Sequence, residues 1–269
     1  MFTYIEESDM VIDAFGGALG AEQSIFANSL CLSIRCTAPG AFIKQVESGM
    51  YRKEVDRDGS TARIFFKNLM LGEERDVLVT MELPAVQDEV EAFQMICTDV
   101  SYVPLGVDVN SPNRLVVAGG DCVVSRVSRG RLDPLATRSE RVDVEINRMV
   151  LTRATEDAMA AADSSDYARA RSTIETALET VNQSPSVASG NARAMAFQAE
   201  LQATLDNVQN SEEYSRRGGR ALMSEQAQNY GAQRCCYQKK ARVTNVFHNA
   251  SSEAYQSKAS RSKVSNISR

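Results

Sequence analysis

The stretch "SLCLSIRCTA", residues 29–38, sets apolar and polar side chains in alternation, which is the period of a half-buried β-strand. Leu30, Leu32 and Ile34 share one face of this strand, because successive side chains point to opposite sides. The pair Pro39-Gly40 follows and marks a turn. The stretch therefore predicts a sheet with one buried face, and the sequence around it should supply the other strands.

Six more strand-like stretches follow before residue 128. They are AFIKQV (41–46), MYRKEV (50–55), STARIFF (60–66), ERDVLVTMELP (74–84), AFQMICTDVSYV (92–103) and RLVVAGGDCVVSRV (114–127). The pair Asp58-Gly59 is a hairpin signal, and Gly119-Gly120 indicates a bulge or a turn within the last strand. Many short strands with turn residues between them favour a β-sandwich over residues 28–134.

The pattern changes to a helical period after "RLDPLATRSER", residues 131–141. Thr137 and Glu140 have the spacing of a capping box. We expect three amphipathic helices and a fourth that is weakened at Gly218-Gly219. The expected apolar stripes are Val142, Ile146, Met149 and Val150, then Tyr167, Ala170, Ile174, Ala177, Leu178 and Val181, then Ala194, Phe197, Leu201, Leu205 and Val208. The predicted fold class is α+β and multi-domain, with the β-sandwich followed by an antiparallel α-helical bundle.

The net charge of −5 is unevenly distributed along the 269 residues. Residues 234–269 hold eight Lys and Arg against one Glu, a net +7, which leaves −12 for the rest of the chain. This basic segment, whose charges include Lys239, Lys240, Arg242, Lys258, Arg261 and Lys263, is also rich in Ser, Asn and Gln. We expect a disordered tail over residues 236–269 that could bind an acidic partner, with a purely solubilising role favoured.

Catalytic and metal-binding patterns are weak in this sequence. The single histidine, His248, lies in the basic tail, where fixed proton-transfer geometry is not expected. Cys31 and Cys36 should face opposite sides of a strand, and Cys235-Cys236 are adjacent, which does not suit zinc. We expect no enzyme, no cofactor and no metal site, and we expect the six cysteines to be free thiols in a reducing, cytoplasmic compartment.

The opening stretch "FTYIEESDMVIDAFGGALG", residues 2–20, predicts a strand at 2–5 that runs directly into an apolar helix. Asp9 and Asp13 interrupt the apolar run, so neither a signal peptide nor a membrane span is predicted. The glycines at 16–20 lie within the helical segment and suit close packing better than phosphate binding. The predicted interaction face of this helix is Val11, Ile12, Phe15, Leu19 and Ile25. Self-association through this face is one expectation.

Residues 3–36, "TYIEESDMVIDAFGGALGAEQSIFANSLCLSIRC", resemble the last strand and helix of a von Willebrand factor A domain, followed by the first strand of the sandwich that trails it. The helical part resembles the associated C-terminal module called Vwaint. The matching residues are Glu145, Asn147, Arg148, Asp166, Tyr214, Gly219, Arg220, Ala221, Ser224, Gly231, Gln233 and Arg234. Such modules occur in plant RING-type ubiquitin ligases of the wavy-growth type and in A-domain proteins joined to Hint modules.

The resemblance implies four segments: an A-domain remnant at 1–27, a sandwich at 28–134, a Vwaint-like module at 135–235 and the tail at 236–269. The A-domain metal motif Asp-x-Ser-x-Ser is broken at Ala62, and RING spacing is missing, so no metal residue is carried over. The chain then looks like the C-terminal, truncated half of such a protein. We expect a non-catalytic interaction or scaffold module with unknown protein partners and no membrane contact. The alternatives are an accessory, substrate-binding part of a ubiquitin ligase system, and nucleic-acid binding through the tail, which is ranked last.

Overall fold

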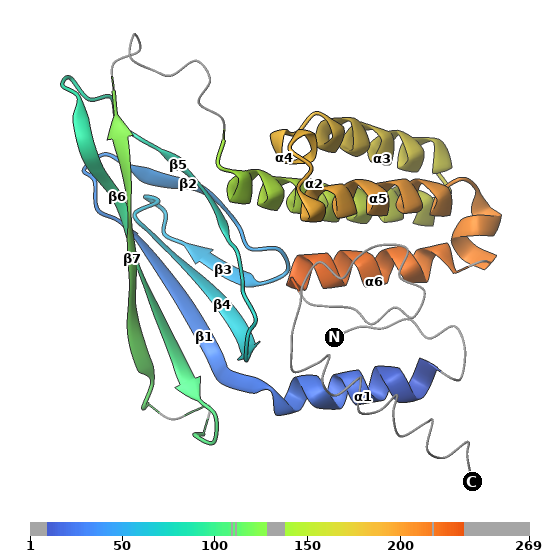
Figure 1. The fold of residues 1–269 in the computed structure, drawn as a ribbon, viewed down its shortest axis with the longest axis horizontal. Helices are drawn as coiled ribbons and strands as arrows, with labels where there is room; N and C mark the ends of the chain where they lie inside the picture. Colours follow the sequence, from blue (N-terminus) through green and yellow to red (C-terminus); the bar gives the residue numbers. More distant parts are fainter. Residues whose placement is uncertain (1–9, 109, 111, 128–137, 217, 234–269) are drawn as a thin grey trace. The chain divides into compact units, whose positions relative to one another are not determined.

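The computed structural model describes residues 10–108, 110, 112–127, 138–216 and 218–233 (Figure 1). The chain forms two compact units, each with its own core. The helical unit comprises Met1–Ser24, Gly72–Arg75 and Arg138–Arg269, and the sheet unit comprises Ile25–Leu71 and Asp76–Thr137. The predicted α+β class is confirmed, since antiparallel sheets come first and most of the helices follow.

The sheet unit contains the seven predicted strands. A five-stranded antiparallel sheet has the order β3-β4-β1-β6-β7, and a two-stranded sheet pairs β2 with β5. The bounds are β1 Ile25–Cys36, β2 Phe42–Glu47, β3 Arg52–Val55, β4 Thr61–Met70, β5 Leu78–Glu82, β6 Val90–Pro104 and β7 Leu115–Arg126. The two sheets enclose one apolar core, to which β1 and β4 contribute Leu30, Ile34, Ile64 and Phe66, and β2 contributes Ile43 and Val46.

The predicted hairpin at Asp58-Gly59 connects β3 to β4. Gly59 has a positive φ of 68°, and its amide donates to the Asp56 carbonyl at 2.9 Å. A Cβ atom on Gly59 would lie 2.8 Å from the Ile43 carbonyl oxygen, so both the backbone angle and the space require glycine here. The turn thus fixes the register of β3 against β4.

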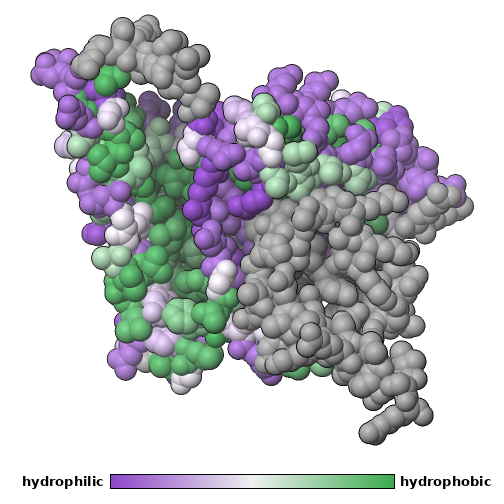
Figure 2. Space-filling view, in the orientation of Figure 1, coloured by the Kyte–Doolittle hydropathy of each residue, from purple (hydrophilic) through white to green (hydrophobic). Residues whose placement is uncertain are grey.

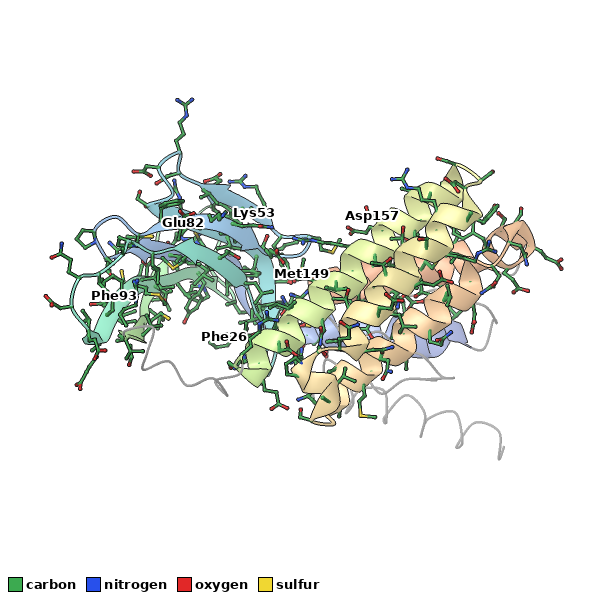
Figure 3. All side chains as sticks on the ribbon, turned by 90° about the horizontal axis from the view of Figure 1, so that it is seen from above. Phe26, Lys53, Glu82, Phe93, Met149 and Asp157 are labelled. Carbon is green, nitrogen blue, oxygen red and sulfur yellow. The ribbon has the colours of Figure 1, made fainter. Side chains whose placement is uncertain are left out.

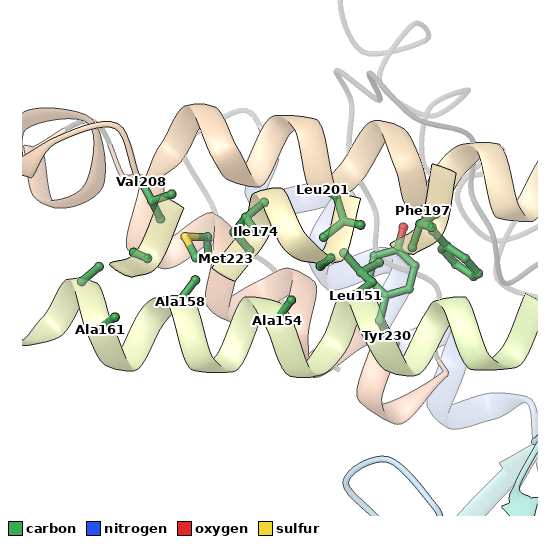
Figure 4. Packing of buried hydrophobic residues seen from close by; sticks show 14 of the residues in the cluster. Leu151, Ala154, Ala158, Ala161, Ile174, Phe197, Leu201, Val208, Met223 and Tyr230 are labelled. Carbon is green, nitrogen blue, oxygen red and sulfur yellow. The ribbon is translucent and has the colours of Figure 1, made fainter. Parts of the chain in front are cut away.

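The helical unit is built mainly from α2 Glu140–Asp163, α3 Tyr167–Asn182, α5 Ala192–Asn207 and α6 Gly219–Ala232. Its shorter parts are α1 Met10–Gln23, α4 Pro185–Ala188 and the π-helical turn η2 Glu212–Arg216. Figure 4 shows how Leu151, Ile174, Leu201 and Met223 meet in the core, with the alanines of α2 facing them. These alanines are short enough to let neighbouring helices approach closely.

Local signals explain where the helices begin. The Asp166 carboxylate accepts the amide of Arg169 at 3.0 Å and caps α3, and Pro185 begins α4 after Ser184. Gly218, at φ 81°, separates η2 from α6. Ser139 is the residue before α2 and its side chain makes no capping bond, and Thr137, at which a capping box was predicted, lies outside the described residues.

The stripes predicted for α3 and α5 are confirmed, because Ala170, Ile174, Phe197 and Leu201 are buried. The stripe predicted for α2 is only partly correct. Val142 is 41% exposed, whereas Asp143, Glu145 and Arg148 are almost fully buried. Helical periodicity of apolar residues could not find the whole of this face, since these charged side chains are buried beside apolar ones such as Val144 and Met149.

Candidate interaction surface

Strand β7, Leu115–Arg126, forms one edge of the five-stranded sheet. Its backbone pairs on one side with β6, from Tyr102↔Leu115 to Val90↔Arg126. No other described strand pairs with its second side. An edge of 12 residues at about 3.3 Å per residue offers roughly 40 Å of backbone donors and acceptors to another chain.

Most side chains of β7 are apolar, and several of them are exposed. Val116 is 67% exposed, and Leu115, Val117 and Val123 are each about half exposed. Figure 2 shows hydrophobic side chains gathered on the surface of the sheet unit. Large apolar residues of this kind usually occur singly on a protein surface, so four along one edge strand make β7 a candidate interaction surface.

The two faces of β7 can be distinguished from its pairing. Leu115, Val117 and Cys122 lie opposite Tyr102, Val100 and Ile96, which pack against the core of the sheet unit. Val116 and Val123 lie opposite Ser101 and Gln94 on the outer face. Apolar residues therefore occur on both faces of the edge strand. When one face of a strand is in contact with water, that face normally carries polar residues, which is not the case for Val116 and Val123.

A β-bulge interrupts β7 at Gly119 and Gly120. Between the pairs Cys97↔Asp121 and Asp99↔Ala118, three steps along β7 face two along β6. Thr98 lies beside this bulge, and its hydroxyl donates to the Gly120 carbonyl at 3.0 Å. A Cβ atom on Gly119 would lie 2.2 Å from the Thr98 Oγ1 atom and 2.7 Å from its carbonyl oxygen. The bulge predicted for these glycines is confirmed, and Gly119 is required by the close approach of β6.

The charged residues at the ends of β7 interact with their own unit. The Arg114 guanidinium donates to the carbonyl oxygens of Ser29 and Ser101, the latter at 3.1 Å. The Arg126 guanidinium donates to the Pro84 carbonyl at 2.9 Å and lies 5.1 Å from the centroid of the Phe93 ring, which Figure 3 labels. The positive charges at the two ends are thus held away from the free edge.

The opposite edge of the same sheet has a different character. Strand β3 has only four residues, Arg52–Val55, and three of them are charged. Arg52 forms an ion pair with Glu54 at 2.7 Å, and the Lys53 ammonium, labelled in Figure 3, donates to the Val46 carbonyl. Short strands with charges are how proteins protect an edge against pairing. By the same criteria, β7 has only Asp121, the bulge and the terminal Arg126, and the Arg126 guanidinium is bound to Pro84.

A cluster of buried charged side chains lies inside the helical unit. The Arg148 guanidinium, with 0% exposure, donates to Glu145 at 2.6 Å and to the Tyr230 carbonyl at 2.8 Å. Arg193 donates to the other Glu145 oxygen at 3.1 Å. Asp143 accepts from the Ser186 amide at 2.9 Å. These bonds join α2 to α4, α5 and α6, so the cluster holds the bundle together.

Two carboxyl groups in this unit have shifted pKa values. Burial alone would raise the pKa of Asp143, but hydrogen bonds from Ser186 and the Arg138 guanidinium hold it below its ordinary value. Burial raises the pKa of Glu200 to about 7, opposed by a hydrogen bond from Tyr230 and assisted by the charge of Glu225. Gln226 also donates to Glu200 at 3.2 Å, and its carbonyl accepts from the Thr204 hydroxyl at 2.7 Å. The Glu200 site brings the acids Glu200 and Glu225 near one amide, one hydroxyl and one phenol, without a histidine or cysteine in these contacts.

Among the described residues, no group of three or more His, Cys, Asp and Glu could hold a metal ion. The described cysteines, at positions 31, 36, 97 and 122, are free and partly buried. None of the helices in the described ranges is long and apolar enough to cross a membrane.

The residues that the sequence proposed for an interaction face are only partly described. On α1, Val11, Phe15 and Leu19 are 47%, 70% and 48% exposed. The side chain of Ile12 lies outside the described residues, and Ile25 begins β1 and is partly buried. Whether another molecule covers the α1 face stays a prediction. The strand predicted at 2–5 and the tail residues, which are Lys239, Lys240, Arg242, Lys258, Arg261 and Lys263, all lie outside the described residues.

Sequence reasoning placed β7 correctly but did not identify it as a surface. The signal was present in "LVVAGGDCVV", residues 115–124, where apolar residues stand next to one another on both sides of the glycines. A run without alternation is also typical of a strand buried on both faces. Only the sheet order, with β7 at the edge, decides between these two interpretations.

Three comparisons with known proteins complete the description. A family model described as "CPSF6-like, RSLD domain, N-terminal region" matches residues 140–266. No curated protein matches the chain. Among solved structures, the chain is similar to "von Willebrand factor type A from Catenulispora acidiphila", at 14% identity and a TM-score of 0.49. The match covers 77% of this chain and 44% of that one, so the chain spans less than half the length of that protein.

The likeness to Vwaint modules, to wavy-growth ligases and to a truncated protein stays a prediction. The matches supply no functional residue, so a function for this chain has to be inferred from its own surface.

Proposed function

We propose that the chain is a non-catalytic protein-interaction module, and that the edge strand β7 is its binding surface. The observation that carries this proposal is the contrast between the two edges of one sheet. The β3 edge is short and charged, whereas the β7 edge is long, apolar and unpaired by any described strand.

Edge strands bind extended segments through main-chain hydrogen bonds, and side chains on alternate positions give specificity. β7 offers both elements. Its free backbone side would supply the bonds, and Val116 and Val123 on the outer face would contact side chains of the added strand. The charged ends, Arg114 and Arg126, are bound to their own unit and leave the edge open.

Narrower forms of this function rest on the family resemblance alone. They are a scaffold role in an A-domain protein, an accessory or substrate-binding part of a ubiquitin ligase system, and a cytoplasmic location. The four free cysteines among the described residues are compatible with a reducing compartment. Binding of nucleic acid or an acidic surface through the tail is a separate proposal, and it requires binding that weakens steeply with salt.

A site-specific photo-crosslinker tests the proposed surface. It is placed at Val116 on β7 and, as the matched control, at Val55 on β3, which is 40% exposed. We expect defined crosslinked species from position 116 and none from position 55. Adding Val123→Lys on the same face should remove them, because a charge would enter the apolar contact. Equal crosslinking from both edges, or none from either, would contradict the proposal.

A further inference from the structure

We propose that the partner of β7 is the β7 strand of a second copy of this chain, in an antiparallel pair with a two-fold axis between Gly119 and Gly120. This inference rests on the proposed function and names its partner. A two-fold interface is self-complementary, because residue i contacts residue j of the partner and residue j contacts residue i. The sequence of β7 must therefore match its own reverse.

The sequence of β7 has this symmetry. Counting outward from the midpoint of Gly119 and Gly120, the strand sets Val116 against Val123 and Leu115 against Val124. Closer to the midpoint, Val117 is set against Cys122, and Ala118 is set against Asp121. Three of these four pairs are apolar on both sides. Pairs of β-branched residues are favourable across an antiparallel ladder.

The β-bulge places the two residues of each symmetric pair on the same face of the sheet. In a regular strand, two residues whose numbers add up to 239 have opposite parity and would face opposite sides of the sheet. The extra residue at Gly119-Gly120 corrects this mismatch. Val116 and Val123 both lie on the outer face, and Val117 and Cys122 both lie on the inner face. Matched positions therefore meet on the same side of the extended sheet.

The charges permit the pairing. Arg114 would lie opposite Ser125 of the second copy, not opposite another arginine, and its guanidinium is already bound to Ser101. Arg126 is likewise bound to Pro84 and stacked near Phe93. The bulge makes the three β7 steps from Ala118 to Asp121 span about two regular steps, so with one strand spacing the two Asp121 residues would lie about 8 Å apart. That is about one Debye length at physiological salt, so their repulsion is reduced but not removed, and the association should tighten as salt is raised.

The resulting contact is narrow, since it is one strand wide. It resembles the smaller protein interfaces in size, and we expect a dissociation constant of about 1–100 µM. Each substitution enters the interface twice, which makes the contact sensitive to single changes at the edge. The association should therefore depend on concentration and should be tunable by charge.

A charge-exchange series tests the pairing in the full-length protein by sedimentation equilibrium. Val116→Lys or Val123→Glu alone should weaken association about ten-fold or more, because each places a charge against a valine of the other copy. The double variant places Lys opposite Glu at both symmetric positions and should recover most of the affinity. Val55→Lys on the β3 edge should leave it unchanged. Lack of recovery in the double variant would contradict this register.

Native Cys122 provides a second test of the register. In the proposed pair, position 117 lies directly opposite Cys122 of the second copy, at a Cα separation suitable for a disulfide. Under mild oxidation Val117→Cys should form a covalent dimer that Cys122→Ser abolishes. Val116→Cys, which faces the other side, should not crosslink to Cys122. Circular dichroism of each variant confirms that the fold is retained.

The outcomes separate this inference from the proposed function. A dimer that is lost in Val116→Lys and locked in Val117→Cys supports the second copy as the partner. A chain that stays monomeric at high concentration, yet still crosslinks to another protein from position 116, overturns the second copy and leaves the interaction surface standing. A monomer with no crosslink from position 116 overturns both.

Discussion

The two units of this chain place their unusual residues in opposite positions. The helical unit buries charged side chains, with Glu145 and Arg148 almost fully enclosed. The sheet unit exposes apolar ones along β7, with Val116 two-thirds exposed. The buried charges have partners within their own unit, whereas the exposed valines have no described strand beside them on the free edge. The buried charges of the helical unit are paired within the chain, whereas the exposed valines of β7 fit the proposal that this edge pairs with a second chain.

The largest expected effect concerns the buried ion pairs of the helical unit. Arg148→Met leaves Glu145 buried with only Arg193 as its charged partner, and breaking a buried ion pair costs about 3–5 kcal/mol. We expect a loss of this size in the unfolding free energy, measured by denaturant titration of the helical circular dichroism signal. The double variant Glu145→Leu/Arg148→Met should regain part of it. A single-variant loss below about 1 kcal/mol would show that the cluster does not hold the bundle.

The next largest effect concerns the β-bulge in the edge strand β7. A Cβ atom at Gly119 would clash with Thr98, while a Cβ atom at Gly120 would meet nothing within 4 Å. Gly119→Ala should therefore destabilise the β6–β7 pairing by about 1–3 kcal/mol. Gly120→Ala should stay within about 0.5 kcal/mol of the wild type or gain slightly. Hydrogen exchange of the β6 and β7 amides measures the change in stability in each of the two variants. Equal protection in the two variants would contradict the described bulge.

The pH dependence of the helical unit gives a third test. The pKa of Glu200 in the folded chain is about 7, above its ordinary value near 4.5, so the folded state holds this proton more tightly. The favourable contribution is present at low pH and is lost as the pH rises through about 7. We expect Glu200→Gln to be more stable than the wild type above pH 7, by about 1–3 kcal/mol.

The measurement for this third test is a set of urea titrations from pH 5 to about pH 8. The difference between Glu200→Gln and the wild type should grow across this range. A constant difference would mean that Glu200 does not titrate there.

The smallest effect separates the two exposed apolar surfaces. Phe15 on α1 is 70% exposed, and Phe15→Ser should change stability by less than about 0.5 kcal/mol. If self-association uses β7, this variant should also keep the wild-type dissociation constant in sedimentation equilibrium. A clear weakening would assign the association to the α1 face that the sequence proposed.

Much of the fold could be predicted from local sequence, because turn residues and apolar periods act over short distances. Asp58-Gly59 placed a hairpin, and the stripe from Ala170 to Val181 placed α3. The face of α2 could not be predicted in the same way. Burial of Arg148 depends on Glu145 and on the Tyr230 carbonyl, which is 82 residues away in the chain.

The candidate surface depended on information that the sequence does not carry locally. Val116, Val117 and Val123 suit a buried central strand as well as an exposed edge. The difference lies in the order of the strands, which sets β7 beside β6 alone among the described strands. The α1 face was proposed from its apolar period, and its described residues Val11, Phe15 and Leu19 are exposed, but its role is untested.

Hydrogen exchange of the wild-type chain at low and high protein concentration tests the central claim most directly. If β7 is where the chain binds a second copy, amides within residues 115–126 should exchange more slowly as concentration rises. Amides of β3, residues 52–55, should not change, although β3 is also an edge strand. Protection that appears on β3, or is absent from β7 at every concentration, would contradict the assignment of β7 as the self-pairing edge.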